Sequence, residues 1–127
     1  MEEPIGKLRR KEGTWVEWGQ WCQELQKSGL TPQVIFEQTG LEPVQQNQLI
    51  GAAQVFNTIG DASAGALQFF MQKGSASLYE LRILPQADRV KAAELIWQLQ
   101  LNPEESRLLA KAMKEFALID PPPPPLH

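Results

Sequence analysis

The sequence of 127 residues contains only one cysteine, Cys22, and one histidine, His127, which is its last residue. A single cysteine excludes an internal disulfide and cannot supply the four ligands of a structural zinc site, so the chain suits a reducing compartment. A histidine at the very end of a chain is poorly placed to complete a Ser/His or Cys/His pair inside a folded domain. We therefore expect no enzymatic activity, no metal and no cofactor.

Long apolar runs are also missing. No stretch approaches the roughly 18 uninterrupted apolar residues of a membrane span. The segment from Met1 to Lys11 lacks the apolar core of a signal peptide. The composition, 43% apolar and 21% charged, is that of one ordinary folded domain. We expect a cytoplasmic protein with no membrane association.

Positive charge is absent from the middle third of the chain. The formal net charge is −3, and residues 28–72 contain no lysine or arginine, only the acids Glu37, Glu42 and Asp61. The basic segment Lys7 to Lys11 lies well before this region. Because affinity for nucleic acid depends largely on neutralised phosphates, the middle third is poorly suited to bind it.

Helix start and stop signals recur along the whole sequence, whereas the alternation typical of strands is hard to find. Thr14 and Glu17 have the spacing of a capping box, Thr31-Pro32 is a second start signal, and Gly40 can end the helix that follows. Ser77 to Glu80 reads as a further capping box. The signals predict an all-α fold, a compact bundle of about seven short helices that begin near residues 14, 31, 44, 63, 77, 86 and 103.

The second and third predicted helices form a helix-turn-helix, because only a short glycine turn separates them. The third is predicted over residues 44–59. Projected around its axis, one half is apolar and is expected to face the core: Val44, Leu49, Ala52, Ala53, Val55, Phe56 and Ile59. The other half carries uncharged polar side chains and one isoleucine: Gln46, Asn47, Ile50, Gln54, Asn57 and Thr58. A neutral amide face is less costly to desolvate than a charged one, so it indicates a protein partner, although it could also be a solvated face.

The last helix and the segment after it complete the domain plan. Leu108, Leu109, Ala112, Met113 and Phe116 are predicted to face inward. The run of prolines at 121–125 cannot join a helix and forms a stiff spacer, which is more typical of an interdomain linker than of a ligand for another module. We expect a tail over residues 1–13, a helical domain over 14–118 and a linker over 119–127.

Two stretches carry a family resemblance. GLTPQVIFEQTGLEPVQQNQLIGAAQVF at 29–56 and SLYELRILP at 77–85 resemble the N-terminal α-domain of the Rubisco accumulation factors of cyanobacteria and chloroplasts. The likeness extends from about Thr14 to Phe116, and the proline run falls where that family has its linker. The absence of a transit peptide resembles the cyanobacterial form.

The resemblance implies a non-catalytic assembly chaperone that binds the Rubisco large subunit and promotes assembly of its dimers into the octameric core. It also implies a dimerising β-domain beyond the linker, so we expect this chain alone to be a monomer and the full-length protein a homodimer. Cyanobacterial members work in the cytosol and plant members in the stroma. Motif positions matched to the family give the expected partner contacts: Gln46, Asn47, Gln48 and Ile50, then Tyr79, Glu80 and Arg82. The second set could instead lock the two halves of the domain together.

Two other functions stay open. A helix-turn-helix could belong to a transcriptional regulator, with Gln45, Gln46 and Asn47 pairing with adenine edges. The missing cations argue against that alternative. A generic scaffold module is the third possibility.

Overall fold

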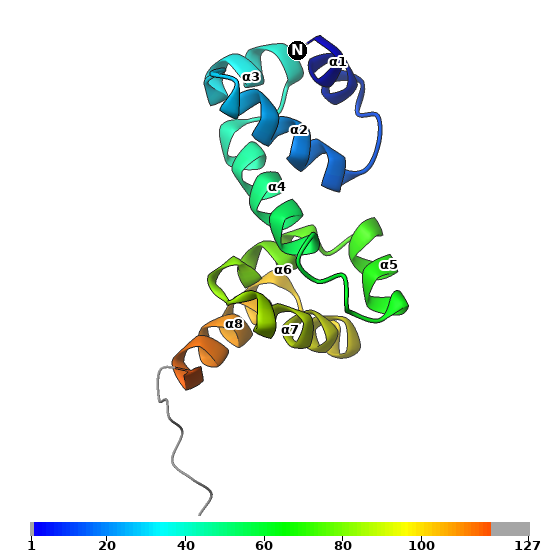
Figure 1. Cartoon of the computed structure of the whole chain (residues 1–127), viewed down its shortest axis with the longest axis vertical. Helices are drawn as coiled ribbons and strands as arrows, with labels where there is room; N and C mark the ends of the chain where they lie inside the picture. Colours follow the sequence, from blue (N-terminus) through cyan, green and yellow to red (C-terminus); the bar gives the residue numbers. More distant parts are fainter. Residues whose placement is uncertain (1, 118–127) are drawn as a thin grey trace, which may run out of the picture.

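A computed structural model describes residues 2–117, and this part of the chain is all-helical, as predicted (Figure 1). It contains eight α-helices, one short 3₁₀ helix and no strand. The elements are α1 (Glu2–Arg10), α2 (Trp15–Lys27), α3 (Pro32–Thr39), α4 (Pro43–Phe56), α5 (Ala64–Gln72), α6 (Ser75–Tyr79), η1 (Glu80–Ile83), α7 (Gln86–Leu99) and α8 (Pro103–Ala117). The predicted linker, residues 119–127, lies outside the described residues.

Most helix boundaries follow from local capping chemistry. The Glu17 backbone N–H donates to the Thr14 hydroxyl, and the Thr14 N–H donates to the Glu17 carboxylate, which completes the predicted capping box of α2. Gly40 adopts a left-handed conformation, φ 83°, where α3 ends. Asn102 and Glu105 exchange the same pair of bonds before α8. The helix-turn-helix therefore consists of α3 and α4.

The expectation of a tail over residues 1–13 is wrong for its greater part, because residues 2–10 form α1. Ile5 and Leu8 lie one helical turn apart and are both buried against α2 and α3. Arg9 donates its Nε–H to the Gln38 carbonyl near the end of α3. The basic residues in the last turn of α1 also suit the negative end of the helix dipole.

The helices pack around two hydrophobic cores, a division that the sequence did not indicate. The N-terminal core lies among α1, α2, α3 and the start of α4, and the C-terminal core lies among the end of α4 and the helices from α5 to α8 (Figure 1). The N-terminal core consists of Ile5, Leu8, Cys22, Leu25, Ile35 and Leu41. Helix α4 supplies Leu49 and Ile50 to the N-terminal core, and Ala52, Val55 and the following Ile59 belong to the other. The two cores are thus joined along one continuous helix.

Helix α2 packs along α4 and also reaches both cores. Gly19 lies against the backbone of Leu49, and a Cβ at that position would be 2.7 Å from the Cβ of Ala53. At the start of α2, the Trp15 indole donates to the Phe70 carbonyl at 2.8 Å and meets the Phe56 ring edge to face. The close crossing and the indole together hold the two halves in one arrangement.

Four predicted inward positions are exposed instead. Val44 is 77% exposed, whereas Gln46 two residues later is buried, so the side of α4 that faces inward at its start is not the one that was predicted. On α8, Leu108, Ala112 and Phe116 lie outside the contact with the C-terminal core, which Leu109, Ala110 and Met113 make. The apolar stripe of α8 is therefore wider than the surface that the domain covers.

The predicted capping box at Ser77 is also wrong. Helix α6 starts at Ser75 after Gly74, whose φ of 88° provides the turn. Ser77 is buried within α6, and Glu80 opens η1. The helix therefore begins before the predicted cap at Ser77, directly after the left-handed turn at Gly74.

Candidate functional site

Gln46 was predicted to lie on an exposed amide face. The structure contradicts this prediction, because the side chain is fully buried. Its Nε2 donates to the carbonyls of Pro32 at 2.9 Å and Leu41 at 2.8 Å, and its Oε1 accepts from the Gln26 amide. The side chain thus closes the turn between α3 and α4 from inside. Both N–H groups of its amide are used, and full burial keeps its oxygen from any partner.

Asn47 and Gln48, the next two residues of α4, do face outward. With Val44, Tyr79 and Glu80 they line a shallow groove of about 310 Å³ between α4 and the α6–η1 segment. We call this feature, made of Val44, Asn47, Gln48, Tyr79 and Glu80, the amide groove. The structure therefore brings together two pairs of predicted contact residues that lie far apart in the sequence.

The walls of the amide groove differ in chemistry. On α4, the exposed isopropyl group of Val44 adjoins two neutral amides. On the other wall, the Tyr79 ring and the half-buried Glu80 side chain face the groove. Such a surface offers apolar contact together with uncharged donors and acceptors, the combination found in protein interfaces.

Arg82 extends this surface beyond the groove. Its guanidinium carbon lies 3.9 Å from the centroid of the Tyr79 ring, and its Nη1 donates to the Tyr79 carbonyl at 3.0 Å. The geometry follows from the local helix type, because side chains at i and i+3 eclipse one another in a 3₁₀ helix. Arg82 is exposed, so the ring holds a guanidinium plane at the surface.

Gly51 of α4 lies beneath the stack, and it was not among the residues predicted from the sequence. A Cβ at this position would lie 2.8 Å from both Cδ1 and Cε1 of Tyr79 and 3.8 Å from Cδ of Arg82. Only glycine leaves room for the ring to rest on the helix. A glycine in the interior of an otherwise regular helix was the available signal, since glycine costs about 1 kcal/mol there and often marks a close approach.

Ile50 is separated from the amide groove. It is partly buried and packs against the N-terminal core, so its side chain anchors the middle of α4 there. Of the seven predicted contact residues, four line the groove (Asn47, Gln48, Tyr79 and Glu80), Arg82 adjoins it, and Gln46 and Ile50 lie outside it, within the N-terminal half.

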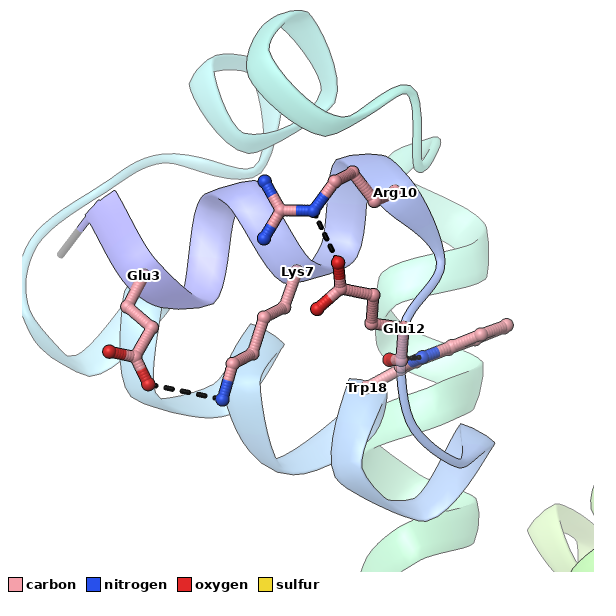
Figure 2. Close-up of polar contacts among 5 residues, drawn as sticks. All are labelled: Glu3, Lys7, Arg10, Glu12 and Trp18. Atoms are coloured by element: carbon pink, nitrogen blue, oxygen red, sulfur yellow. Dashed lines mark hydrogen bonds and ion pairs between the residues drawn. The ribbon is translucent and has the colours of Figure 1, made fainter.

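The basic segment Lys7 to Lys11 is engaged within the N-terminal half (Figure 2). Lys7 pairs with Glu3 at 3.0 Å and lies 5.3 Å from the centroid of the Trp21 ring. Arg10 pairs with Glu12, which lowers the pKa of that carboxyl through a hydrogen bond, and the Trp18 indole donates to the Glu12 carbonyl at 2.7 Å. These contacts fasten α1 and its connection onto α2.

Cys22 is completely buried in the N-terminal core, and burial raises the pKa of its thiol to about 11. Such a thiol is almost wholly protonated at neutral pH and behaves as a small apolar side chain. Within residues 2–117, no group of three His, Cys, Asp or Glu side chains is gathered closely enough to bind a metal ion. None of the helices described here has the length and apolar character needed to cross a bilayer.

Comparison with known families agrees with this architecture. Residues 1–60 match the model of the Rubisco accumulation factor 1 helix turn helix domain, and residues 70–125 match that of the Rubisco accumulation factor 1 alpha helical domain. The chain belongs to the Rubisco accumulation factor 1 family. The resemblance found in the sequence is thereby confirmed. The boundary between the two matches falls after α4, the helix that joins the two cores.

Individual relatives show the same family. A RuBisCO accumulation factor 1 from Thermosynechococcus vestitus is 49% identical over 112 residues, 88% of this chain and 32% of the relative. One from Nostoc is 48% identical over 118 residues, 91% of this chain and 33% of the relative. A chloroplastic Rubisco accumulation factor 1 from Zea mays is 36% identical over 122 residues, 91% of this chain and 26% of the relative. The chain thus spans about a third of the length of the cyanobacterial relatives.

Proposed function

We propose that this chain is the helical module of a Rubisco assembly chaperone and that its amide groove binds the Rubisco large subunit. The proposal rests on the family to which the chain belongs and on one structural observation. That observation is the meeting of Asn47 and Gln48 with Tyr79 and Glu80 in a single exposed groove. In this proposal, binding promotes assembly of large-subunit dimers into the octameric core.

The architecture supports a binding role without catalysis. The groove offers amides, a phenol ring and one carboxylate, a set that can pair with a polypeptide backbone. We propose that the module works in the cyanobacterial cytosol, and its plant relatives in the stroma. We further propose that this chain alone is a monomer, and that the full-length protein dimerises through a β-domain beyond the proline run.

Nucleic acid is the less favoured partner. Two of the three base-reading candidates at the start of α4 are engaged within the domain, since Gln46 is buried and Gln45 accepts a hydrogen bond from the Glu42 N–H. Helices α3 and α4 carry no lysine or arginine that could neutralise phosphates. The cations of α1 are engaged with Glu3, Glu12 and the α3 carbonyl.

The experiment is a binding titration of this chain against purified Rubisco large subunit. A groove variant carries Asn47→Glu and Gln48→Glu, which places two carboxylates in the amide groove. A charge-matched control carries Gln54→Glu and Gln68→Glu, two exposed amides on α4 and α5 that lie outside the groove. We expect the groove variant to bind at least about tenfold more weakly, a change of roughly 1.4 kcal/mol, because charged groups then need to be desolvated.

Two further measurements make the result decisive. The melting temperature and helical circular dichroism of both variants should match the parent chain, because Asn47, Gln54 and Gln68 are exposed and Gln48 is only half-buried. Equal affinities for the groove variant and its control would refute the proposal. A shift of labelled DNA in the same range of protein concentration at low salt would favour the regulator function instead.

A further inference from the structure

Arg82 differs from the other four arginines in how its guanidinium is used. Arg9 and Arg89 donate their Nε–H groups to backbone carbonyls, and Arg10 and Arg107 donate theirs to carboxylates. Arg82 alone, within residues 2–117, has no hydrogen bond from Nε or Nη2. Its Nη1 is held by the Tyr79 carbonyl, so the free N–H groups lie along one edge of the plane.

That edge has the geometry of a carboxylate receptor. The Nε–H and Nη2–H groups of arginine are parallel and match the two oxygens of a carboxylate. In the part of the chain that the structure describes, no Asp or Glu oxygen lies within 4.0 Å of Arg82, although three other cations have such a partner. Stacking on Tyr79, with Gly51 beneath the ring, restricts the side chain before any partner arrives.

The surroundings of Arg82 fit one carboxylate better than a polyanion. The adjoining groove contributes the neutral amides Asn47 and Gln48 and the apolar Val44, but no second cation. Glu80 in the opposite wall and Glu42 before α4 would repel a chain of phosphates. A polypeptide segment instead can place one acidic side chain on Arg82, and its backbone can pair with the two amides.

We propose that Arg82 binds an aspartate or glutamate side chain of the partner, carried on an extended segment that lies along the amide groove. This inference rests on the proposed function, since it assigns the chemistry that the same surface recognises. The Tyr79 ring fixes the plane of the guanidinium, and Gly51 fixes the position of the ring. Glu80 disfavours segments with a second acidic residue on its side of the groove.

A double-mutant cycle with the Rubisco large subunit tests the inference. Arg82→Gln should weaken binding by about tenfold or more, because it removes the charge-assisted hydrogen bonds to the partner's carboxylate. Arg82→Lys should lose an intermediate amount, since it keeps the charge and loses the paired N–H edge. Surface carboxylates of the large subunit are then replaced one at a time by amides. One of them should lower the affinity by a similar factor and have little further effect on the Arg82→Gln chain.

The matched control is Lys91→Gln, which removes one exposed positive charge in the middle of α7. Its affinity should stay within about twofold of the parent chain, since a remote surface charge has only a weak, screened effect. Unchanged affinity for Arg82→Gln would overturn the inference. The inference would also be overturned if the loss of affinity from Arg82→Gln added to the loss from every carboxylate replacement in the large subunit. Arg82 would then act only by supporting η1.

A second readout separates this inference from the proposed function. Nitrogen-15 spectra of the arginine Nε–H groups are recorded while N-acetylglutamate is added, with N-acetylglutamine as the neutral probe. We expect the Arg82 signal to shift with glutamate alone, and to shift more than that of Arg89. If the parent chain fails to bind the large subunit while this selective shift appears, the proposed partner is wrong and the carboxylate site stands. Equal shifts for both arginines would contradict the site itself.

Discussion

Gly19 of α2 lies directly against the carbonyl group of Leu49 of α4. A Cβ on Gly19 would be 2.9 Å from the carbonyl carbon of Leu49 and 2.7 Å from the Cβ of Ala53. The contact is located where α4 passes from the N-terminal core to the C-terminal core. The close crossing of these helices therefore fixes the direction of the helix that carries one wall of the amide groove.

Gly19→Ala should destabilise the chain by about 1–3 kcal/mol, because the added methyl group overpacks the contact between α2 and α4. The loss should exceed the gain in helix propensity, which is at most about 1 kcal/mol. Urea unfolding followed by circular dichroism measures the change. Gly60→Ala is the control, since a Cβ there meets no atom within 4 Å. Equal stability of the two variants would contradict this prediction, because α2 and α4 would then move apart at no cost to accommodate the methyl group.

Gln46→Leu should cost about 1–3 kcal/mol of stability, because the carbonyls of Pro32 and Leu41 lose their donor inside the protein. The neighbouring variant Asn47→Leu removes an exposed amide and should change stability by less than about 0.5 kcal/mol. Thermal or chemical unfolding compares the two. If Gln46→Leu left the free energy of unfolding unchanged, the buried hydrogen bonds of Gln46 would make no net contribution to stability.

Cys22 should be inert in the folded chain. Since burial raises the pKa of its thiol to about 11, very little thiolate exists at pH 8. Because the folded state favours the protonated thiol, its contribution to stability is complete below the ordinary pKa near 9.0 and falls as the pH rises toward 11. Ellman's reagent should react slowly in buffer and rapidly in denaturant. Fast reaction without denaturant would contradict the burial of this thiol.

Gly51→Ala distinguishes the role of the Tyr79–Arg82 stack in binding from its role in stability. Alanine raises the helix propensity of α4 by up to about 1 kcal/mol. Its methyl group nevertheless displaces the Tyr79 ring, and with it the Arg82 guanidinium. We expect the melting temperature to be kept within a few degrees and binding to the large subunit to weaken. Unchanged affinity would show that the position of the stack is irrelevant to the partner.

Features fixed by neighbours in sequence could be predicted. The Thr14–Glu17 and Asn102–Glu105 caps depend on side chains three residues apart, and the turn at Gly40 depends on one glycine. Helix α1 was missed because only Ile5 and Leu8 reveal its apolar face. A pattern of two residues is too short to distinguish a docked helix from a tail.

Features fixed by tertiary contacts could not be predicted. The helical projection put Gln46 on the side of α4 opposite its apolar residues. In the folded chain, α3 and the connection to α4 cover that side and supply the carbonyls to which Gln46 donates. The projection likewise could not show that Gln48 and Tyr79 line one groove, since the packing of α6 on α4 decides it. The family resemblance supplied both sets of residues, and only the structure shows that they share one groove.

Site-specific photocrosslinking gives the most direct test of the claim that the amide groove binds the Rubisco large subunit. A benzophenone amino acid is placed at position 48 in the groove or, as control, at position 91 on α7, and each chain is irradiated with purified large subunit. We predict an adduct of this chain with the large subunit from position 48 and little from position 91. Crosslinking from position 91 but not from position 48 would contradict the claim and place the interface on another face.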